Sequence, residues 1–319
     1  MSLIGRLVSA HRIVLLAGVA AFVLCFGAVG QAPHAGPAAA VPASPPALDP
    51  TIDPPRRLDV TDLRQPRIRA RAAMIYNPTT HEILWESNGF EQRSIASITK
   101  VMTALVFLEP RPDLDGDVVI SRRDVRRAST TYLRRGEVVS LYNLLHLALV
   151  ASDNVAARAL ARVSPWGTAG FVEQMNAMAA ALGLRDTSFT DPSGLDSGNV
   201  STAYDISRLI AHATKRPVVS SIMRKQAHRL RTSRRRLTVR NTNRLLRGRL
   251  AVHGGKTGYI DASGYCLATV VKLPDHDPLS LVVLGAGSGE RRFSEVRRLA
   301  TWVSRNGAAL AASGVGPAD

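Results

Sequence analysis

Ile95-Ala-Ser-Ile-Thr-Lys-Val-Met-Thr-Ala104 is the stretch that says most about the fold and chemistry of this chain. It places Ser97 and Lys100 three positions apart, and the run from Ile98 to Leu108 is almost entirely apolar, with that lysine as its only charge. Residues i and i+3 of a helix lie on one face, so the two side chains would be neighbours. A run that is apolar almost all round predicts a buried central helix.

This pairing suits a serine nucleophile with a lysine base. A serine hydroxyl reacts poorly until a base takes its proton. Burial lowers the pKa of a lysine, so Lys100 could take the proton from Ser97 near neutral pH. The alternative is a surface lysine whose stem follows the apolar residues while its ammonium stays in water. An S-x-x-K pattern alone does not decide between them.

Two further motifs follow in order, Ser152-Asp-Asn154 and Lys256-Thr-Gly258, after 152 − 97 = 55 and 256 − 152 = 104 residues. Ser152 and Asn154 are expected on a loop between two helical stretches, where Asn154 could simply cap the second helix. The lysine motif falls in a strand that contains several glycines, or at an ordinary turn-to-strand junction. The ordered triple nevertheless predicts a serine acyl-transfer site.

The three motifs resemble those of the low-molecular-mass penicillin-binding proteins, which are serine D-alanyl-D-alanine peptidases. The likeness runs from about Ala72 to about Val303 and is strongest to the endopeptidase branch, of the penicillin-binding protein 7 type. Other blocks that carry it are Leu182-Gly-Leu-Arg-Asp-Thr-Ser-Phe189, Asp191-Pro-Ser-Gly-Leu195, Asn199-Val-Ser-Thr-Ala203, Asn241-Thr-Asn-Arg-Leu-Leu246 and Gly264-Tyr-Cys-Leu-Ala268. The resemblance implies a peptidase that cleaves D-alanine cross-links or termini of peptidoglycan stem peptides and is inhibited by penicillin.

The catalytic residues expected on this interpretation are Ser97, Lys100 and Ser152. Ser97 is the nucleophile, Lys100 is its base, and the Ser152 hydroxyl relays a proton to the leaving amine.

The substrate-binding residues expected are Asn154, Lys256, Thr257, Gly258 and Tyr259. Asn154 would bind the substrate amide and orient the lysine base, while Lys256 and Thr257 would face a substrate carboxylate. Gly258 lies in a strand that a peptide could approach closely. The backbone N–H groups of the nucleophile and of Tyr259 would form an oxyanion hole, worth ~3–4 kcal/mol per donor.

The order of elements predicts an α+β fold: an antiparallel sheet flanked by helices, with a mostly helical sub-domain that carries Ser152. This matches the penicillin-binding-protein and β-lactamase type of transpeptidase fold that the resemblance implies. The predicted boundaries are a signal peptide at 1–30 (possibly a retained anchor), a proline- and alanine-rich linker at 31–68, the peptidase domain at 69–305 and a flexible tail at 306–319.

The net charge of +16 is concentrated between Lys215 and Arg249, which hold eleven arginines and two lysines. Such a segment attracts anions, so anionic membrane headgroups or wall polymers are possible partners. A merely solvated basic surface is the alternative. Nucleic acid is not expected, because an exported chain meets little of it and the segment lacks aromatics for base stacking. The predicted location is the periplasm or cell envelope.

No cofactor or metal is expected. The eight histidines show no metal-ligand spacing, and His146 is expected in the core or on a helix face. Cys266 is the only cysteine after the predicted signal peptide and is expected to be a small buried residue.

Two other functions stay open. A class A β-lactamase shares the triad but uses a glutamate roughly 35 residues beyond S-D-N to release the acyl group. Residues 183–201 contain no glutamate. A non-catalytic wall-binding protein would be expected to have a damaged site, whereas all the motif side chains are intact.

Overall fold

The computed structural model describes residues 55–129 and 131–314. Its centre is a six-stranded sheet of order β1-β3-β2-β12-β11-β10, in which only the β1–β3 pair is parallel. The strands are β1 (Arg56–Arg57), β2 (Ala72–Asn77), β3 (Glu82–Ser87), β10 (Ala251–Ile260), β11 (Gly264–Lys272) and β12 (Leu279–Ala286). The predicted hairpin around Asn77 and the predicted three C-terminal strands are thereby confirmed.

Three two-stranded ladders and ten helical segments complete the described fold. The ladders are β4 (Arg93–Ser94) with β7 (Val200–Ser201), β5 (Asp117–Val119) with β6 (Val138–Ser140), and β8 (Ala227–Arg231) with β9 (Arg236–Arg240). The α-helices are α1 (Thr99–Leu108), α2 (Arg122–Val125), α3 (Leu141–Val150), α4 (Asn154–Val163), α5 (Gly167–Ala181), α6 (Ala203–Lys215), α7 (Pro217–Met223) and α8 (Gly289–Gly314). The 3-10 turns are η1 (Ala96–Ile98) and η2 (Arg244–Arg247).

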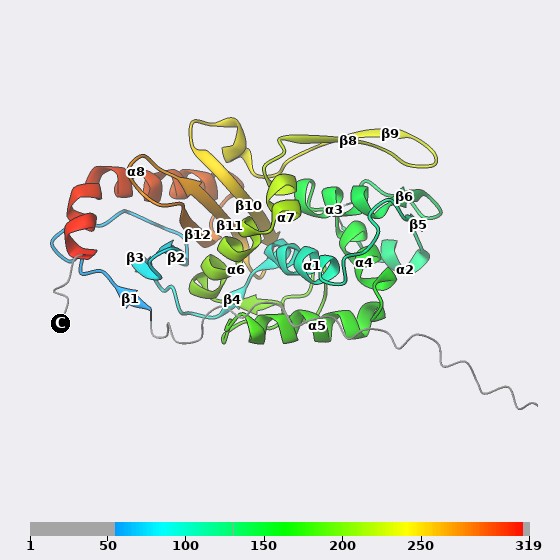
Figure 1. Cartoon of the computed structure of the whole chain (residues 1–319), viewed down its shortest axis with the longest axis horizontal. Helices are drawn as coiled ribbons and strands as arrows, with labels where there is room; N and C mark the ends of the chain where they lie inside the picture. Colours follow the sequence, from blue (N-terminus) through cyan, green and yellow to red (C-terminus); the bar gives the residue numbers. More distant parts are fainter. Residues whose placement is uncertain (1–54, 130, 315–319) are drawn as a thin grey trace, which may run out of the picture. The chain divides into compact units, whose positions relative to one another are not determined.

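The sheet separates two hydrophobic cores. Every residue of β12 is buried, and its side chains alternate between the two faces as strand geometry requires. Leu281 and Val283 join the core under α8, whereas Val282 and Leu284 join the larger core that contains α1, α3 and α4. Figure 1 shows α8 at one end of the view and α3, α4 and the β8–β9 hairpin together at the other. The predicted α+β class and the helical block around Ser152 are confirmed.

Ordered elements also lie on both sides of the predicted peptidase domain at 69–305, whose boundaries stay a prediction. β1 pairs with β3, and two indole donors bind the segment that follows it: Trp85 to the Gln65 side chain at 2.6 Å and Trp302 to the Arg64 carbonyl at 2.8 Å. At the other end α8 continues to Gly314, because its alanine-rich end favours helix. Leu310 on this helix is buried. The predicted signal peptide and the first part of the linker lie outside the described residues. No helix among those described is long and apolar enough to cross a bilayer.

Candidate active site

Ser97 and Lys100 meet where η1 passes into α1. Lys100 Nζ donates to Ser97 Oγ at 2.8 Å, the contact predicted from their i and i+3 spacing. Ala96, just before the serine, has a left-handed φ of 49°, which costs energy in a residue with a side chain. Strained residues of this kind cluster at functional sites. Here the left-handed conformation of Ala96 forms the turn on which the half-buried Ser97 lies.

Lys100 has no exposed surface and contacts no carboxylate. Besides the serine, its amine contacts Asn154 Oδ1 at 2.7 Å and the carbonyl oxygen of Ser193. Burial lowers its pKa to about 7, although the more distant charges of Asp191 and Asp153 oppose the shift. A large fraction of Lys100 is therefore neutral at physiological pH, as a proton acceptor must be. The alternative of a surface lysine is wrong.

The Asp191-Pro-Ser-Gly-Leu195 block forms the loop that closes over this lysine. The Asp191 carboxylate accepts from the backbone N–H of Ser193 at 3.1 Å and of Gly194 at 2.8 Å. Gly194 has φ +79°, and a Cβ there would lie 2.0 Å from the Ala96 carbonyl oxygen, so only glycine lets the loop reach the strained turn. Sequence reasoning missed the Ser193 carbonyl, whose one signal is the turn-forming Asp-Pro-Ser-Gly pattern.

The Ser152-Asp-Asn154 motif contributes two side chains to the site and one to the scaffold. Asp153, not Asn154, caps α4, because its carboxylate accepts from the N–H of Ala156 at 2.9 Å. The capping alternative for Asn154 is therefore wrong, and its amide oxygen is available to Lys100. Ser152 has φ +61° and accepts a hydrogen bond from Lys256 at 2.8 Å.

β10 carries the Lys256-Thr-Gly258 motif along an edge of the main sheet. A Cβ on Gly258 would lie 2.7 Å from the Ile95 carbonyl oxygen and 3.3 Å from the Ser97 nitrogen, so glycine lets this strand touch the nucleophile turn. Tyr259 is 47% exposed at the rim. The oxyanion hole formed by the Ser97 and Tyr259 amides stays a prediction.

Lys256 is a second buried lysine in the same site. Burial lowers its pKa well below the usual range, and the positive charges of Lys100 and Arg292 lower it further. Its amine donates to Ser152 and, at 2.8 Å, to the Thr257 carbonyl. Thr257 Oγ1 in turn donates to Thr242 Oγ1 at 2.7 Å. An anionic group of a substrate would stabilise the charged form of this lysine.

Arg292 is a neighbour of the site that sequence reasoning did not find. From α8 it donates to the Gly258 carbonyl at 3.1 Å, and its guanidinium lies over the rings of Tyr265 and Phe293. Tyr265 also stacks on Tyr259 with ring centroids 4.2 Å apart. Arg292 therefore supports the end of β10 from behind, and no local motif marks it in the sequence.

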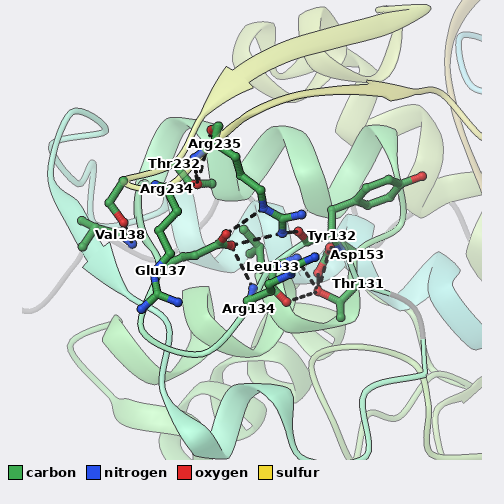
Figure 2. A network of polar contacts seen from close by, with 11 residues as sticks. Thr131, Tyr132, Leu133, Arg134, Glu137, Val138, Asp153, Thr232, Arg234 and Arg235 are labelled. Carbon is green, nitrogen blue, oxygen red and sulfur yellow. Dashed lines mark hydrogen bonds and ion pairs between the residues drawn. The ribbon is translucent and has the colours of Figure 1, made fainter.

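The turn of the β8–β9 hairpin is tied to the Ser152-Asp-Asn154 motif through a polar network (Figure 2). Arg235 Nε donates to the fully buried Glu137 at 2.7 Å, and its Nη2 donates to the Tyr132 carbonyl. Tyr132 N then donates to Asp153 Oδ2 at 2.6 Å, and Thr131 Oγ1 also bonds this carboxylate. Burial raises the pKa of Glu137, but hydrogen bonds from Arg235 and Arg134 outweigh that effect and hold it below its ordinary range.

Other predicted features take ordinary structural places. Cys266 is fully buried, and burial raises the pKa of its thiol, as expected for a core residue. His146 is also buried, where it bonds the Tyr142 carbonyl and Lys225. In the part of the chain that is described, no three histidine, cysteine, aspartate or glutamate side chains are grouped as a metal site. The expected absence of a cofactor stays an expectation.

Comparison with known proteins points to one family. Residues 59–288 match the family model described as D-alanyl-D-alanine carboxypeptidase. D-alanyl-D-alanine endopeptidases of Escherichia coli K12 and Pseudomonas aeruginosa are 35% and 34% identical, over 76% and 75% of this chain and 80% and 78% of theirs. The Streptomyces K15 DD-transpeptidase structure superposes with a TM-score of 0.71 at 27% identity, covering 76% of this chain and all of that one. A D-alanyl-D-alanine carboxypeptidase structure from Mycobacterium tuberculosis gives the same TM-score at 26% identity, over 76% of this chain and 94% of that one. These structures confirm the predicted transpeptidase fold.

The low pKa of Lys100 predicts a pH dependence for acylation of the site. Below pH 7 the amine is protonated and cannot accept a proton, so acylation by penicillin should slow with a midpoint near pH 7. Lys100→Arg, whose guanidinium stays protonated, should lose acylation at every pH while circular dichroism shows an intact fold. A flat profile between pH 6 and 8, or rapid acylation of this variant, would contradict the assignment.

The network in Figure 2 predicts that Arg235 contributes more to the free energy of unfolding than its neighbour Arg236, which is exposed. Arg235→Gln leaves the buried carboxylate of Glu137 without its charged partner, which should lower the free energy of unfolding by about 2 kcal/mol. Arg236→Gln should change it by less than about 0.5 kcal/mol. Urea denaturation of both variants measures the difference, and equal midpoints would show that the ion pair contributes nothing.

Proposed function

The chain belongs to the D-alanyl-D-alanine carboxypeptidase family, and from that premise we propose that it hydrolyses D-alanine amide bonds in peptidoglycan through an acyl-enzyme on Ser97. The observation that carries this proposal is the 2.8 Å contact between the Ser97 hydroxyl and a buried lysine whose pKa is about 7. It supplies both a nucleophile and a base suited to neutral pH.

The first half of the reaction transfers the acyl group to the enzyme. Neutral Lys100 takes the proton of Ser97 Oγ as that oxygen attacks the carbonyl carbon of the penultimate D-alanine. The N–H groups of Ser97 and Tyr259 stabilise the negative charge that develops on the carbonyl oxygen. The C–N bond then breaks, and the proton that Lys100 took from Ser97 passes through the Ser152 hydroxyl to the leaving amine, which leaves Lys100 neutral again; Ser152 is held for this step by its hydrogen bond from Lys256.

The second half returns the enzyme to its starting state. Water attacks the ester carbon and gives one proton to neutral Lys100. Lys100 passes this proton to Ser97 Oγ as the ester C–O bond breaks, and the released carboxylic acid gives its own proton to solvent. Before the C–N bond breaks, the substrate chain lies along the open edge of β10, with its amide on Asn154 and the carboxylate of its leaving part toward Lys256 and Thr257. The position of β10 at the sheet edge supports this arrangement.

The β-lactamase alternative is not supported. Residues 183–201 provide no glutamate, and the carboxylate of Asp191 is already engaged by five donors: the N–H groups of Ser193, Gly194 and Asp196, the Ser193 hydroxyl and Asn199 Nδ2. A bulky penicilloyl ester should therefore persist, which makes penicillin an inhibitor. The intact, closely contacting motif side chains also argue against a non-catalytic wall-binding protein.

Within the family, we assign the chain to cleavage of cross-links. The relatives named D-alanyl-D-alanine endopeptidase match at 34–35% identity, whereas relatives named D-alanyl-D-alanine carboxypeptidase match at 29–32%. Peptidoglycan lies outside the cytoplasmic membrane, so this function requires export to the periplasm or envelope, in agreement with the predicted signal at 1–30.

The basic segment 215–249 is proposed to contact anionic wall polymer. Three of its arginines form ion pairs inside the domain: Arg216 with Glu109, Arg235 with Glu137, and Arg244 with Glu290. The exposed arginines of the β8–β9 hairpin are Arg229, Arg231, Arg236 and Arg240 on its strands and Arg234 in its turn. β9 leads directly to Thr242, which bonds Thr257, so polymer bound at the site passes close to this hairpin.

The nucleophile assignment predicts that penicillin forms one covalent adduct, on Ser97. Ser97→Ala should abolish the adduct, because no other serine hydroxyl is hydrogen-bonded to Lys100 in the described part of the chain. Intact-mass spectrometry after incubation with penicillin measures this. Ser152→Ala is the comparison variant, which should keep a slower reaction at Ser97. An adduct that persists in Ser97→Ala would identify a different nucleophile.

The endopeptidase assignment predicts opening of cross-linked muropeptide dimers. Incubation of purified dimers and of monomeric pentapeptides with the protein, followed by mass spectrometry, separates the two activities. Monomers released from dimers are expected, and Ser97→Ala is the blank. If pentapeptides lose D-alanine while dimers stay intact, the protein is a carboxypeptidase.

A further inference from the structure

A groove of about 540 Å³ lies on the outer side of α8, against the chain segment 64–67. Five arginines line it, and no acidic residue does. They are Arg64, Arg67, Arg297, Arg298 and Arg305. The groove is separate from the catalytic side chains, and neither the family resemblance nor the proposed reaction assigns it a role.

Two hydrogen bonds hold the walls of this groove together. Trp302 Nε1 donates to the Arg64 carbonyl at 2.8 Å, and Arg298 Nη1 donates to the Arg67 carbonyl at 3.3 Å. The Trp302 indole is 5% exposed and forms the floor. The groove is therefore built before any ligand arrives, and what it offers a ligand is charge rather than an aromatic surface.

The charge of the groove is poorly neutralised by the protein. Among the described residues, Glu290 is the one acidic partner of these arginines, at 3.5 Å from Arg297, and it also pairs with Arg244 at 3.0 Å. Both Arg297 and Glu290 are more than half exposed, where ion pairs contribute little. Five like charges around one concave surface favour a ligand that brings several negative charges.

We propose that this groove binds the phosphate headgroups of anionic phospholipids and so holds the protein on a membrane surface. The planar guanidinium matches two phosphate oxygens at once, which makes arginine well suited to such headgroups. A space of this volume accommodates more than a single phosphate. The proposal rests on the proposed function only in placing the protein in the cell envelope.

The position of the groove favours a membrane over wall polymer. α8 packs on one face of the sheet, whereas α1, with Lys100, packs on the other. Seating α8 on a bilayer therefore turns the catalytic side chains away from the lipid and toward the wall.

A bilayer also presents a dense plane of phosphates to all five arginines, whereas wall peptides carry their carboxylates on separate flexible stems. The apolar run 13–30 ends 64 − 30 = 34 residues before Arg64, so both features belong to the same part of the chain.

The experiment compares two variants that each remove four positive charges from the full chain. The groove variant is Arg64→Gln, Arg67→Gln, Arg297→Gln and Arg305→Gln, which keeps the structural Arg298. The hairpin variant is Arg229→Gln, Arg231→Gln, Arg236→Gln and Arg240→Gln. Binding is measured by co-sedimentation with phosphatidylglycerol–phosphatidylethanolamine vesicles and with neutral phosphatidylcholine vesicles, which account for any contribution of the apolar run.

The groove variant should bind anionic vesicles at least tenfold more weakly than the unmodified protein, since each basic side chain at such a surface contributes a factor of about five. The hairpin variant should lose less than threefold, and binding to neutral vesicles should be the same for all three proteins. Equal losses in both variants, or no loss in the groove variant, would overturn the proposal. Weaker binding of the groove variant to isolated sacculi, with vesicle binding unchanged, would assign the groove to wall polymer and also overturn it.

Penicillin labelling of Ser97 in the same preparations keeps the two proposals distinguishable. Both variants should be labelled as fast as the unmodified protein, which also shows that they are folded. Failure of all three proteins to be labelled would contradict the proposed reaction and leave the vesicle comparison valid.

Discussion

Exclusion of water from one amine is the constraint on which the rest of this structure depends. Among the described residues Lys100 is hydrogen-bonded to a hydroxyl, an amide oxygen and a carbonyl, and the charges of Asp191 and Asp153 only partly offset the lowering of its pKa by burial. Keeping a lysine in that state requires tight packing on every side. The large core around α1, the Asp191 loop and the start of α4 provide it. Much of the helical block thus serves to keep water away from the amine of Lys100.

The second requirement is that a strand edge must reach the nucleophile. Gly258 and Gly194 bring two backbones against the turn at Ala96 from opposite sides, where any side chain would collide. The serine therefore lies in a narrow gap between the Asp191 loop and β10. Positive φ angles at Ala96 and Ser152 are the strain that this arrangement imposes, and the surrounding hydrogen bonds hold both residues in place.

The parts that sequence could predict were those encoded locally. The spacing of Ser97 and Lys100 predicted their contact, and the apolar run predicted the buried helix, because both follow from helical periodicity. Three contacts could not be predicted, because each joins residues that are distant in sequence. They are those of the Ser193 carbonyl with Lys100, of Arg292 with Gly258 and of Arg235 with Glu137. The same holds for the segment after Pro55, which is hydrogen-bonded by Trp85 and Trp302, since no local pattern reveals these partners. The arginine groove likewise combines two segments about 230 residues apart. The density of positive charge along the sequence indicates only the segment 215–249.

An open sheet edge beside the nucleophile also affects how copies of this protein behave toward one another. The edge of β10 that can receive a substrate strand can in principle receive a strand of a second molecule, which is the usual route to edge-to-edge aggregation. The net charge of +16 opposes such encounters, because two molecules repel each other before their edges meet. The excess of arginine therefore favours solubility, because it lowers the chance that two molecules pair through the uncovered edge of β10. High ionic strength screens that repulsion and so removes this protection of the edge.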